Sequence, residues 1–181
     1  MESTRPNPTN PKQPPSATIP CAVALGSNLG ESQRILAAAL QQLGSLTETT
    51  VTARSSLYKT APVGPPQPDY LNACALIETH LSAQDLMAAL LAIEADFGRI
   101  RQERWGPRIL DLDLILYADQ VINEPDLQLP HPRFRERAFV LVPLAEIAPH
   151  WVDPVTGRTI LDLCSALDRN GVEPLSSAES A

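Results

Sequence analysis

Lysine, cysteine and long apolar runs are scarce in this chain, and each scarcity excludes a class of protein. Only two lysines are present and no Gly-x-x-x-x-Gly-Lys-Ser/Thr motif occurs, which excludes a P-loop kinase. Neither a run of 18 apolar residues nor an apolar N-terminal signal segment exists, so we expect no transmembrane helix and no secretion. Cys21, Cys74 and Cys164 are odd in number and lack metal-ligand spacing, which favours buried thiols and a cytoplasmic protein.

The formal net charge is −7, from 14 basic and 21 acidic residues, which argues against nucleic-acid or anionic-membrane partners. Half of the basic residues nevertheless belong to two arginine clusters. The clusters comprise Arg99, Arg101, Arg104 and Arg108, and then Arg133, Arg135 and Arg137. Arginine suits bidentate contacts with phosphate, so the clusters predict a phosphate clamp, although a set of solvated surface charges stays an alternative.

Composition divides the 181 residues into one domain and two tails. Residues 1–17 contain five prolines and almost no large apolar side chains, so we expect this segment to be disordered. Residues 171–181 are small and polar and are expected to be a flexible C-terminal tail. The folded domain is expected to span residues 18–170.

Apolar periodicity predicts an alternation of strands and helices. The main expected elements are strands at 19–25, 49–58, 69–79 and 110–117, and helices at 32–43 and 82–97. The helix at 82–97 is expected to begin at an N-cap Ser82. The remaining expectations are a hairpin of 121–122 with 110–117, a short strand at 127–129, and helices at 135–144 and 161–167. The order predicts a ferredoxin-like α+β sandwich, with a central, mostly antiparallel sheet and helices on its faces.

Two carboxylates, Asp111 and Asp113, stand inside the apolar strand predicted at 110–117. Residues two apart in a strand share a face and lie about 7 Å apart, so the two acids repel unless cations compensate. Because Arg108 lies three residues earlier, we interpret the segment as a magnesium site beside a phosphate clamp, with room for two Mg²⁺ ions. An ordinary surface strand face is the alternative. The glycine-containing segment at 26–30 is interpreted as a structural turn.

The run Arg-Trp-Gly-Pro-Arg-x-x-Asp-Leu-Asp-Leu-Ile at 104–115 resembles the signature of the 6-hydroxymethyl-7,8-dihydropterin pyrophosphokinase family of folate biosynthesis. Further segments resemble the same family in order, so that the resemblance covers about residues 19–165. These segments are 24–30, 58–65, 67–73, 121–123, 129–132 and 137–144. The resemblance implies pyrophosphate transfer from ATP to the pterin hydroxymethyl group, with two Mg²⁺ ions, by a monomeric enzyme.

The resemblance also implies roles for individual residues. The implied catalytic residues are Arg99, Arg108, Asp111 and Asp113, of which the two aspartates bind metal. The implied pterin-binding residues are Thr60, Pro62, Val63, Tyr70, Asn72, Trp105 and Phe139. The implied ATP-binding residues are Glu94, Arg99, Arg101, Trp105, Arg108, Leu114, His131 and Arg137.

Several positions depart from the pattern of that family, all on the nucleotide side. The segment from Arg99 to Trp105 is one residue shorter than the bacterial pattern, Pro132 replaces a common tyrosine, and Asp126 replaces a frequent basic residue. Two other classes stay open as alternatives. One is a nucleotide-binding regulatory module without catalysis, and the other is a two-metal phosphohydrolase.

Overall fold

The computed structural model describes residues 17–62, 64–98 and 107–176. Its elements follow in the order β1 (Ile19–Ser27), α1 (Ser32–Gly44), β2 (Thr49–Arg54), β3 (Tyr58–Thr60), β4 (Tyr70–Thr79), α2 (Ala83–Asp96), β5 (Asp111–Tyr117), β6 (Ile122–Glu124), β7 (Leu127–Leu129), the 3₁₀ turn η1 (Phe134–Glu136), α3 (Ala138–Ile147), α4 (Ile160–Ser165) and β8 (Val172–Pro174). Among these residues, no helix has the length and apolar character needed to cross a membrane.

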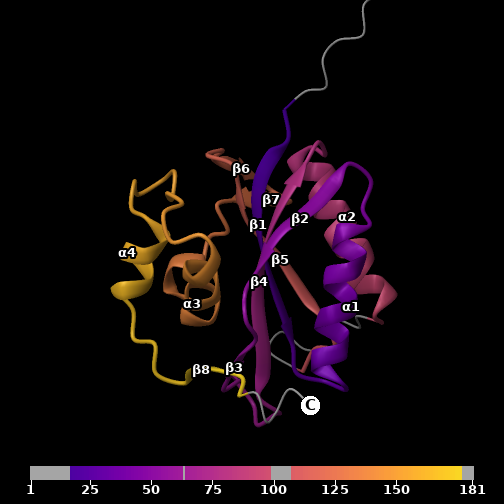
Figure 1. Cartoon of the computed structure of the whole chain (residues 1–181), viewed down its shortest axis with the longest axis vertical. Helices are drawn as coiled ribbons and strands as arrows, with labels where there is room; N and C mark the ends of the chain where they lie inside the picture. The colour runs from indigo at the N-terminus through magenta and orange to yellow at the C-terminus, as the bar shows by residue number, and fades with distance from the viewer. Residues whose placement is uncertain (1–16, 63, 99–106, 177–181) are drawn as a thin grey trace, which may run out of the picture.

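The main sheet has the strand order β5-β1-β4-β3-β8, with β2 also paired to β4. Every pair in it is antiparallel. β1 lies between β5 and β4, so that one strand touches both of the sequence segments that carry candidate site residues. The ferredoxin-like arrangement predicted from the element order is confirmed, and Figure 1 shows helices on both faces of the sheet.

Helices α1 and α2 cover one face of the sheet and α3 and α4 the other (Figure 1). Two apolar cores result. Leu36, Leu43, Leu86 and Leu90 from the first pair of helices pack against the sheet in one core. In the second, Phe134, Leu141 and Leu144 pack against residues such as Cys74 and Ile115. β1 is buried on both faces, which explains its nearly continuous apolar sequence.

The helix predicted at 82–97 begins as expected. Ser82 is the N-cap of α2, and its Oγ accepts a hydrogen bond of 3.1 Å from the backbone N–H of Asp85. This bond satisfies one of the N–H groups that a helix leaves unpaired in its first turn. The helix ends at Asp96, and Gly98 follows with a φ of +77°.

The single strand predicted at 49–58 is wrong, because the structure has two strands, β2 and β3, separated by a polar break. Both pair with β4. At the break the Ser55 hydroxyl accepts from the backbone N–H of Cys74, at 2.9 Å, and the Ser55 N–H donates to the Cys74 carbonyl. The Ser55 hydroxyl thus replaces a backbone carbonyl as the acceptor and interrupts the backbone hydrogen bonds to β4.

Three further expectations are corrected at the C-terminal side of the fold. β6 pairs with β7, not with β5, because the turn at 125–126 folds these two short strands onto each other. The third helix begins at Ala138 instead of 135, because η1 occupies the preceding residues, and it continues to Ile147. Residues 172–174 of the expected flexible tail form β8, which pairs antiparallel with β3.

Candidate active site

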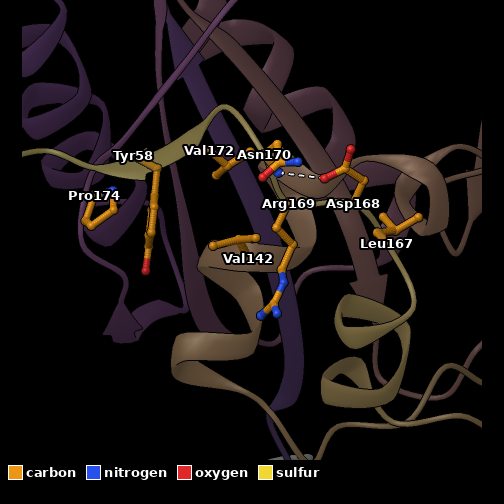
Figure 2. Close-up of a pocket in the computed structure, with 8 residues that line it drawn as sticks. All are labelled: Tyr58, Val142, Leu167, Asp168, Arg169, Asn170, Val172 and Pro174. Carbon is orange, nitrogen blue, oxygen red and sulfur yellow. Dashed lines mark hydrogen bonds between the residues drawn. The ribbon is translucent and has the colours of Figure 1, made fainter.

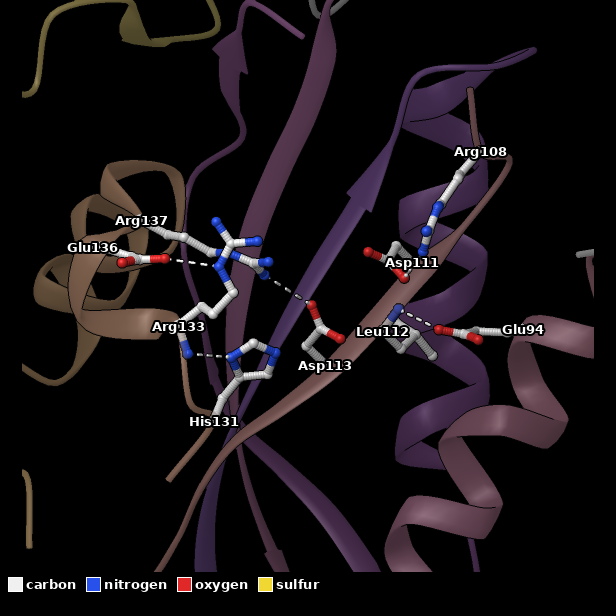
Figure 3. A network of polar contacts seen from close by, with 9 residues as sticks. All are labelled: Glu94, Arg108, Asp111, Leu112, Asp113, His131, Arg133, Glu136 and Arg137. Carbon is white, nitrogen blue, oxygen red and sulfur yellow. Dashed lines mark hydrogen bonds and ion pairs between the residues drawn. The ribbon is translucent and has the colours of Figure 1, made fainter. Parts of the chain in front are cut away.

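Asp111 and Asp113 lie on the same face of β5, as the strand periodicity predicts (Figure 3). Both side chains are partly exposed, at 29% and 30%. The intervening Leu112, with Leu114, belongs to the core on the opposite face of the sheet. The Leu114 side chain therefore faces away from the aspartates, which leaves its backbone as the part that can approach a nucleotide.

Each aspartate has an arginine beside it. Arg108 Nη1 lies 3.0 Å from Asp111 Oδ1, and Arg137 Nη1 lies 3.8 Å from Asp113 Oδ2. One arginine comes from the segment before β5 and the other from the residue that precedes α3. These two cations offset the repulsion that two carboxylates on one strand face would otherwise experience.

Glu94 on α2 supports the strand from its open edge. β5 is the last strand on its side of the sheet, so its outward backbone groups have no neighbouring strand. The N–H of Leu112 instead donates to Glu94 Oε1 at 2.8 Å, and the glutamate is only 1% exposed. The structure thus places this predicted ATP-binding residue behind the aspartates, where it positions β5.

His131 is hydrogen-bonded to β5 at Ile115, two residues beyond Asp113. Its backbone N–H donates to the Ile115 carbonyl at 2.9 Å, and its Nδ1 accepts from the Arg133 N–H at 3.1 Å. Burial first, and then the nearby Arg137 cation, lower the pKa of His131 to about 4. The imidazole is therefore neutral at pH 7 with its proton on Nε2, because Nδ1 acts as the acceptor.

The predicted pterin side occupies β3 and β4. Asn72 Nδ2 donates to Thr60 Oγ1 at 2.7 Å, and both residues are buried. Tyr70 lies two residues before Asn72 and so faces the same side of β4, while Tyr70 pairs with Thr60 in the register. Pro62 lies half-buried in the loop that follows β3.

Gly26 on β1 lies between Asp111 and the predicted pterin-binding residue Asn72. It is opposite Asp111 on β5 and opposite Asn72 on β4. Two strand spacings separate those partners, so their backbones are about 10 Å apart. A Cβ at this position would lie 3.0 Å from Asn72 Oδ1, so a side chain here would crowd the amide.

Phe139 extends the same site from the other layer. It lies in the first turn of α3 and packs partly buried beside the second core. The Arg137 guanidinium lies 5.6 Å from the centre of its ring. Since Arg137 also approaches Asp113, the predicted ring-stacking residue and the predicted metal ligand share one neighbour.

Asn28 is a site residue that the sequence analysis missed. Its Nδ2 donates to Gln67 Oε1 at 2.9 Å and to the Pro68 carbonyl at 3.0 Å, and its Oδ1 accepts from the Arg108 N–H at 2.8 Å. It is 4% exposed. Asn28 therefore connects the pterin-side loop to the arginine beside Asp111. The signal was its place in the turn at 26–30, which we had interpreted as structural only.

Within the second arginine cluster, Arg135 has a different environment from Arg137. Arg135 does not face the aspartates, since its Nε and Nη2 donate to the fully buried Asp153 carboxylate at 2.6 and 2.8 Å. Burial alone would raise the pKa of Asp153, but hydrogen bonds from Arg135, Thr156 and the Val155 N–H hold it at about 2. For this arginine, the interpretation as part of a phosphate clamp is wrong.

Four of the predicted site residues, Val63, Arg99, Arg101 and Trp105, lie outside the described residues. Within the described ranges, no group of three or more His, Cys, Asp or Glu side chains could enclose a metal ion. The donor set at β5 is thus two carboxylates on one face. This set fits Mg²⁺, which completes its octahedron with phosphate oxygens and water.

A cavity of about 520 Å³ lies elsewhere, between β3, α3 and the segment that leads to β8 (Figure 2). Its lining includes Tyr58, Val142, Arg169 and Val172. None of the predicted site residues lines it. The cavity therefore does not describe the site around the aspartates.

Residues 22–149 match the model of the 7,8-dihydro-6-hydroxymethylpterin-pyrophosphokinase (HPPK) family. The chain belongs to this family. A Synechocystis relative named 2-amino-4-hydroxy-6-hydroxymethyldihydropteridine pyrophosphokinase is 46% identical over 168 residues, covering 93% of this chain and 86% of the relative. A Pseudomonas aeruginosa relative of the same name is 45% identical over 157 residues, covering 86% of this chain and 96% of the relative.

Solved structures agree with the HPPK fold. The wild-type Plasmodium falciparum HPPK-DHPS with pterin and p-hydroxybenzoate has a TM-score of 0.67 at 14% identity. The match covers 82% of this chain but only 43% of that one, so the chain spans less than half of the fusion protein. At this identity the likeness concerns the fold alone.

Proposed function

We propose that this chain transfers the pyrophosphoryl group of ATP to the hydroxymethyl oxygen of 6-hydroxymethyl-7,8-dihydropterin, releasing AMP. Relatives that carry the corresponding name cover most of this chain, which supports the proposal. The observation that carries it is the position of Gly26, which has Asp111 on one neighbouring strand and Asn72 on the other. A metal–phosphate site and a heterocycle site thus adjoin across one residue without a side chain.

The metal side of the proposal rests on Asp111 and Asp113. They would hold Mg²⁺, and we propose that two ions bind. The ions would offset charge on the phosphates and polarise the acceptor hydroxyl. Arg108 and Arg137, which now pair with the aspartates, would turn their guanidinium groups toward phosphate oxygens when ATP binds. His131 would donate from Nε2–H to a phosphate oxygen, because its Nδ1 is already an acceptor.

Nucleotide binding would also draw on three of the predicted ATP-binding residues that lie outside the described ranges, Arg99, Arg101 and Trp105. Leu114 would contribute through its backbone, because its side chain is in the core. Glu94 would act through the Leu112 N–H. These residues would orient the triphosphate in line with the acceptor oxygen, which is the main contribution a protein makes to phosphoryl transfer.

The pterin side rests on Asn72 and its neighbours. The Asn72 amide donates to Thr60, which fixes its orientation and leaves Oδ1 as the acceptor for an N–H at the edge of the heterocycle. Phe139 would stack on the ring, and Tyr70 would border it. Pro62 and Val63 would supply contacts from the loop after β3.

We further propose that the enzyme acts as a monomer in the cytoplasm. The three cysteines are free and buried in the structure, in keeping with a reducing compartment. A phosphohydrolase is less well supported, because the described residues lack the larger ligand set that such an enzyme uses.

Nucleotide analysis tests the activity. The protein is incubated with ATP and Mg²⁺, with and without the hydroxymethyl dihydropterin, and the nucleotides are separated by chromatography. AMP is expected only when the pterin is present. ADP in both reactions would indicate a phosphohydrolase, whereas ATP binding without any product would indicate a regulatory module.

A further inference from the structure

The arginines around η1 point to two different sides of that turn. Arg135 is bound to the buried Asp153. Arg137 pairs with Asp113, whereas Arg133 pairs with Glu136 and its guanidinium lies beside that of Arg137 (Figure 3). The arginine pattern predicts a phosphate clamp for the whole cluster, and the family resemblance assigns ATP binding to Arg137 alone. The geometry separates Arg135 from the cluster and leaves Arg133 beside Arg137.

The Arg133 guanidinium lies beside that of Arg137, which pairs with Asp113 (Figure 3). Both Arg133 and Arg137 lower the pKa of His131, and both lower the pKa of Glu136, most strongly through the Arg133 hydrogen bond. Arg133 Nε lies 2.7 Å from Glu136 Oε1, and its backbone N–H donates to His131. Two guanidinium groups thus lie together on one side of the site.

Glu136 is a weakly held partner for Arg133. The side chains of Arg133 and Glu136 are 49% and 62% exposed, and ion pairs of this exposure contribute little to stability. A phosphate offers more negative charge and accepts from a guanidinium in bidentate geometry. Replacing Glu136 with a phosphate oxygen would therefore strengthen the contacts of Arg133.

We propose that Arg133 is a further nucleotide-binding residue, which exchanges Glu136 for a phosphate oxygen when ATP binds beside Asp113. The proposal rests on ATP being the co-substrate, as proposed above. Glu136 then acts as an anionic substitute that occupies Arg133 before the nucleotide arrives. The two residues consequently have opposite effects on nucleotide affinity, although they form one ion pair.

Isothermal titration calorimetry tests this with Mg²⁺ and α,β-methylene ATP, which needs no turnover. Arg133→Ala is expected to raise the Kd about tenfold, the loss expected for one charge-assisted contact. Arg133→Lys should have a Kd between those of the wild type and Arg133→Ala, because lysine keeps the charge but not the bidentate geometry. Glu136→Gln should lower the Kd about twofold. Arg158→Ala, an exposed arginine that donates to the Asp162 carbonyl on α4, is the matched control and should leave the Kd unchanged.

Thermal melting checks that each variant is folded. Equal weakening by Arg133→Ala and Glu136→Gln would show that the pair only stabilises η1, and would overturn the proposal. A wild-type Kd in Arg133→Ala would overturn it as well. The same proteins are then assayed for AMP. Wild-type protein that binds the analogue but forms no AMP would refute the proposed activity while leaving the result for Arg133 intact.

Discussion

The backbone N–H of Leu112, the residue between the two aspartates, donates a hydrogen bond of 2.8 Å to Glu94 Oε1. Glu94 is buried on α2 and the bond lies on the open edge of the sheet. Helix α2 thus takes the place of a missing strand and fixes the segment that presents Asp111 and Asp113. The stability of the fold and the position of the two aspartates proposed as metal ligands depend on the same carboxylate.

Replacement of Glu94 is expected to affect both properties. Glu94→Ala leaves the buried Leu112 N–H without its acceptor, so the free energy of unfolding should fall by about 1–3 kcal/mol. The kcat should fall too, because the aspartates on either side lose a fixed backbone. Glu94→Gln keeps an acceptor oxygen and should retain most of the stability. Urea denaturation and steady-state kinetics measure the two effects. Wild-type stability and kcat in Glu94→Ala would contradict the positioning role.

Asn28 should couple the binding of the two substrates. Asn28→Ala removes the bonds to Gln67, Pro68 and Arg108, so the KM values for pterin and ATP should both rise severalfold. Asn123→Ala on the exposed strand β6 is the control and should change neither KM. A rise in only one of the two KM values would show that Asn28 supports one segment and does not connect them.

The Arg135–Asp153 pair predicts a specific loss of stability in acid. The pKa of Asp153 is about 2 in the folded protein and about 3.9 in an unfolded chain. Its contribution is therefore fully present above about pH 4 and is lost as the pH falls through about 2. Asp153→Asn should lower the free energy of unfolding by about 3 kcal/mol at pH 7, because it leaves Arg135 without its carboxylate.

Urea denaturation of both proteins between pH 7 and pH 2 tests this. The difference between wild type and Asp153→Asn should shrink as the pH falls from 4 to 2. A difference that stays constant over that range would show that folding does not lower the pKa of Asp153.

Metal removal should abolish activity without unfolding the protein. The proposed metal ligands, Asp111 and Asp113, are partly exposed side chains on one strand, so we expect the metal to serve the reaction and not the stability of the fold. EDTA is expected to stop AMP formation and leave the melting temperature unchanged. Asp113→Asn should remove turnover in the presence of Mg²⁺, whereas Asp119→Asn, at an exposed position after β5, should not. A large drop in melting temperature with EDTA would indicate a structural ion instead.

Local patterns were sufficient for much of the fold. The period of two in β5 placed both aspartates on one face, and the Ser82 N-cap marked the start of α2. Patterns failed where a tertiary partner decided the outcome. The break between β2 and β3 depends on the Cys74 N–H meeting the Ser55 hydroxyl, and no local sequence feature encodes that pairing.

The site shows the same division. Residue types and spacing indicated Asp111, Asp113 and Asn72, but the role of Gly26 between them depends on the pairing register of three strands. Likewise, the arginines at 133, 135 and 137 form one cluster in the sequence. The 3₁₀ turn sends Arg135 to a buried aspartate 18 residues later, which charge patterning alone does not reveal.

The central claim is that two phosphoryl groups are transferred together to the pterin. Phosphorus NMR of a reaction with ATP, Mg²⁺ and 6-hydroxymethyl-7,8-dihydropterin tests it most directly, with Asp113→Asn as the inactive control. We expect a pterin product with two coupled phosphorus signals, formed in equal amount with AMP. A pterin monophosphate with ADP, or free phosphate without a pterin product, would contradict it.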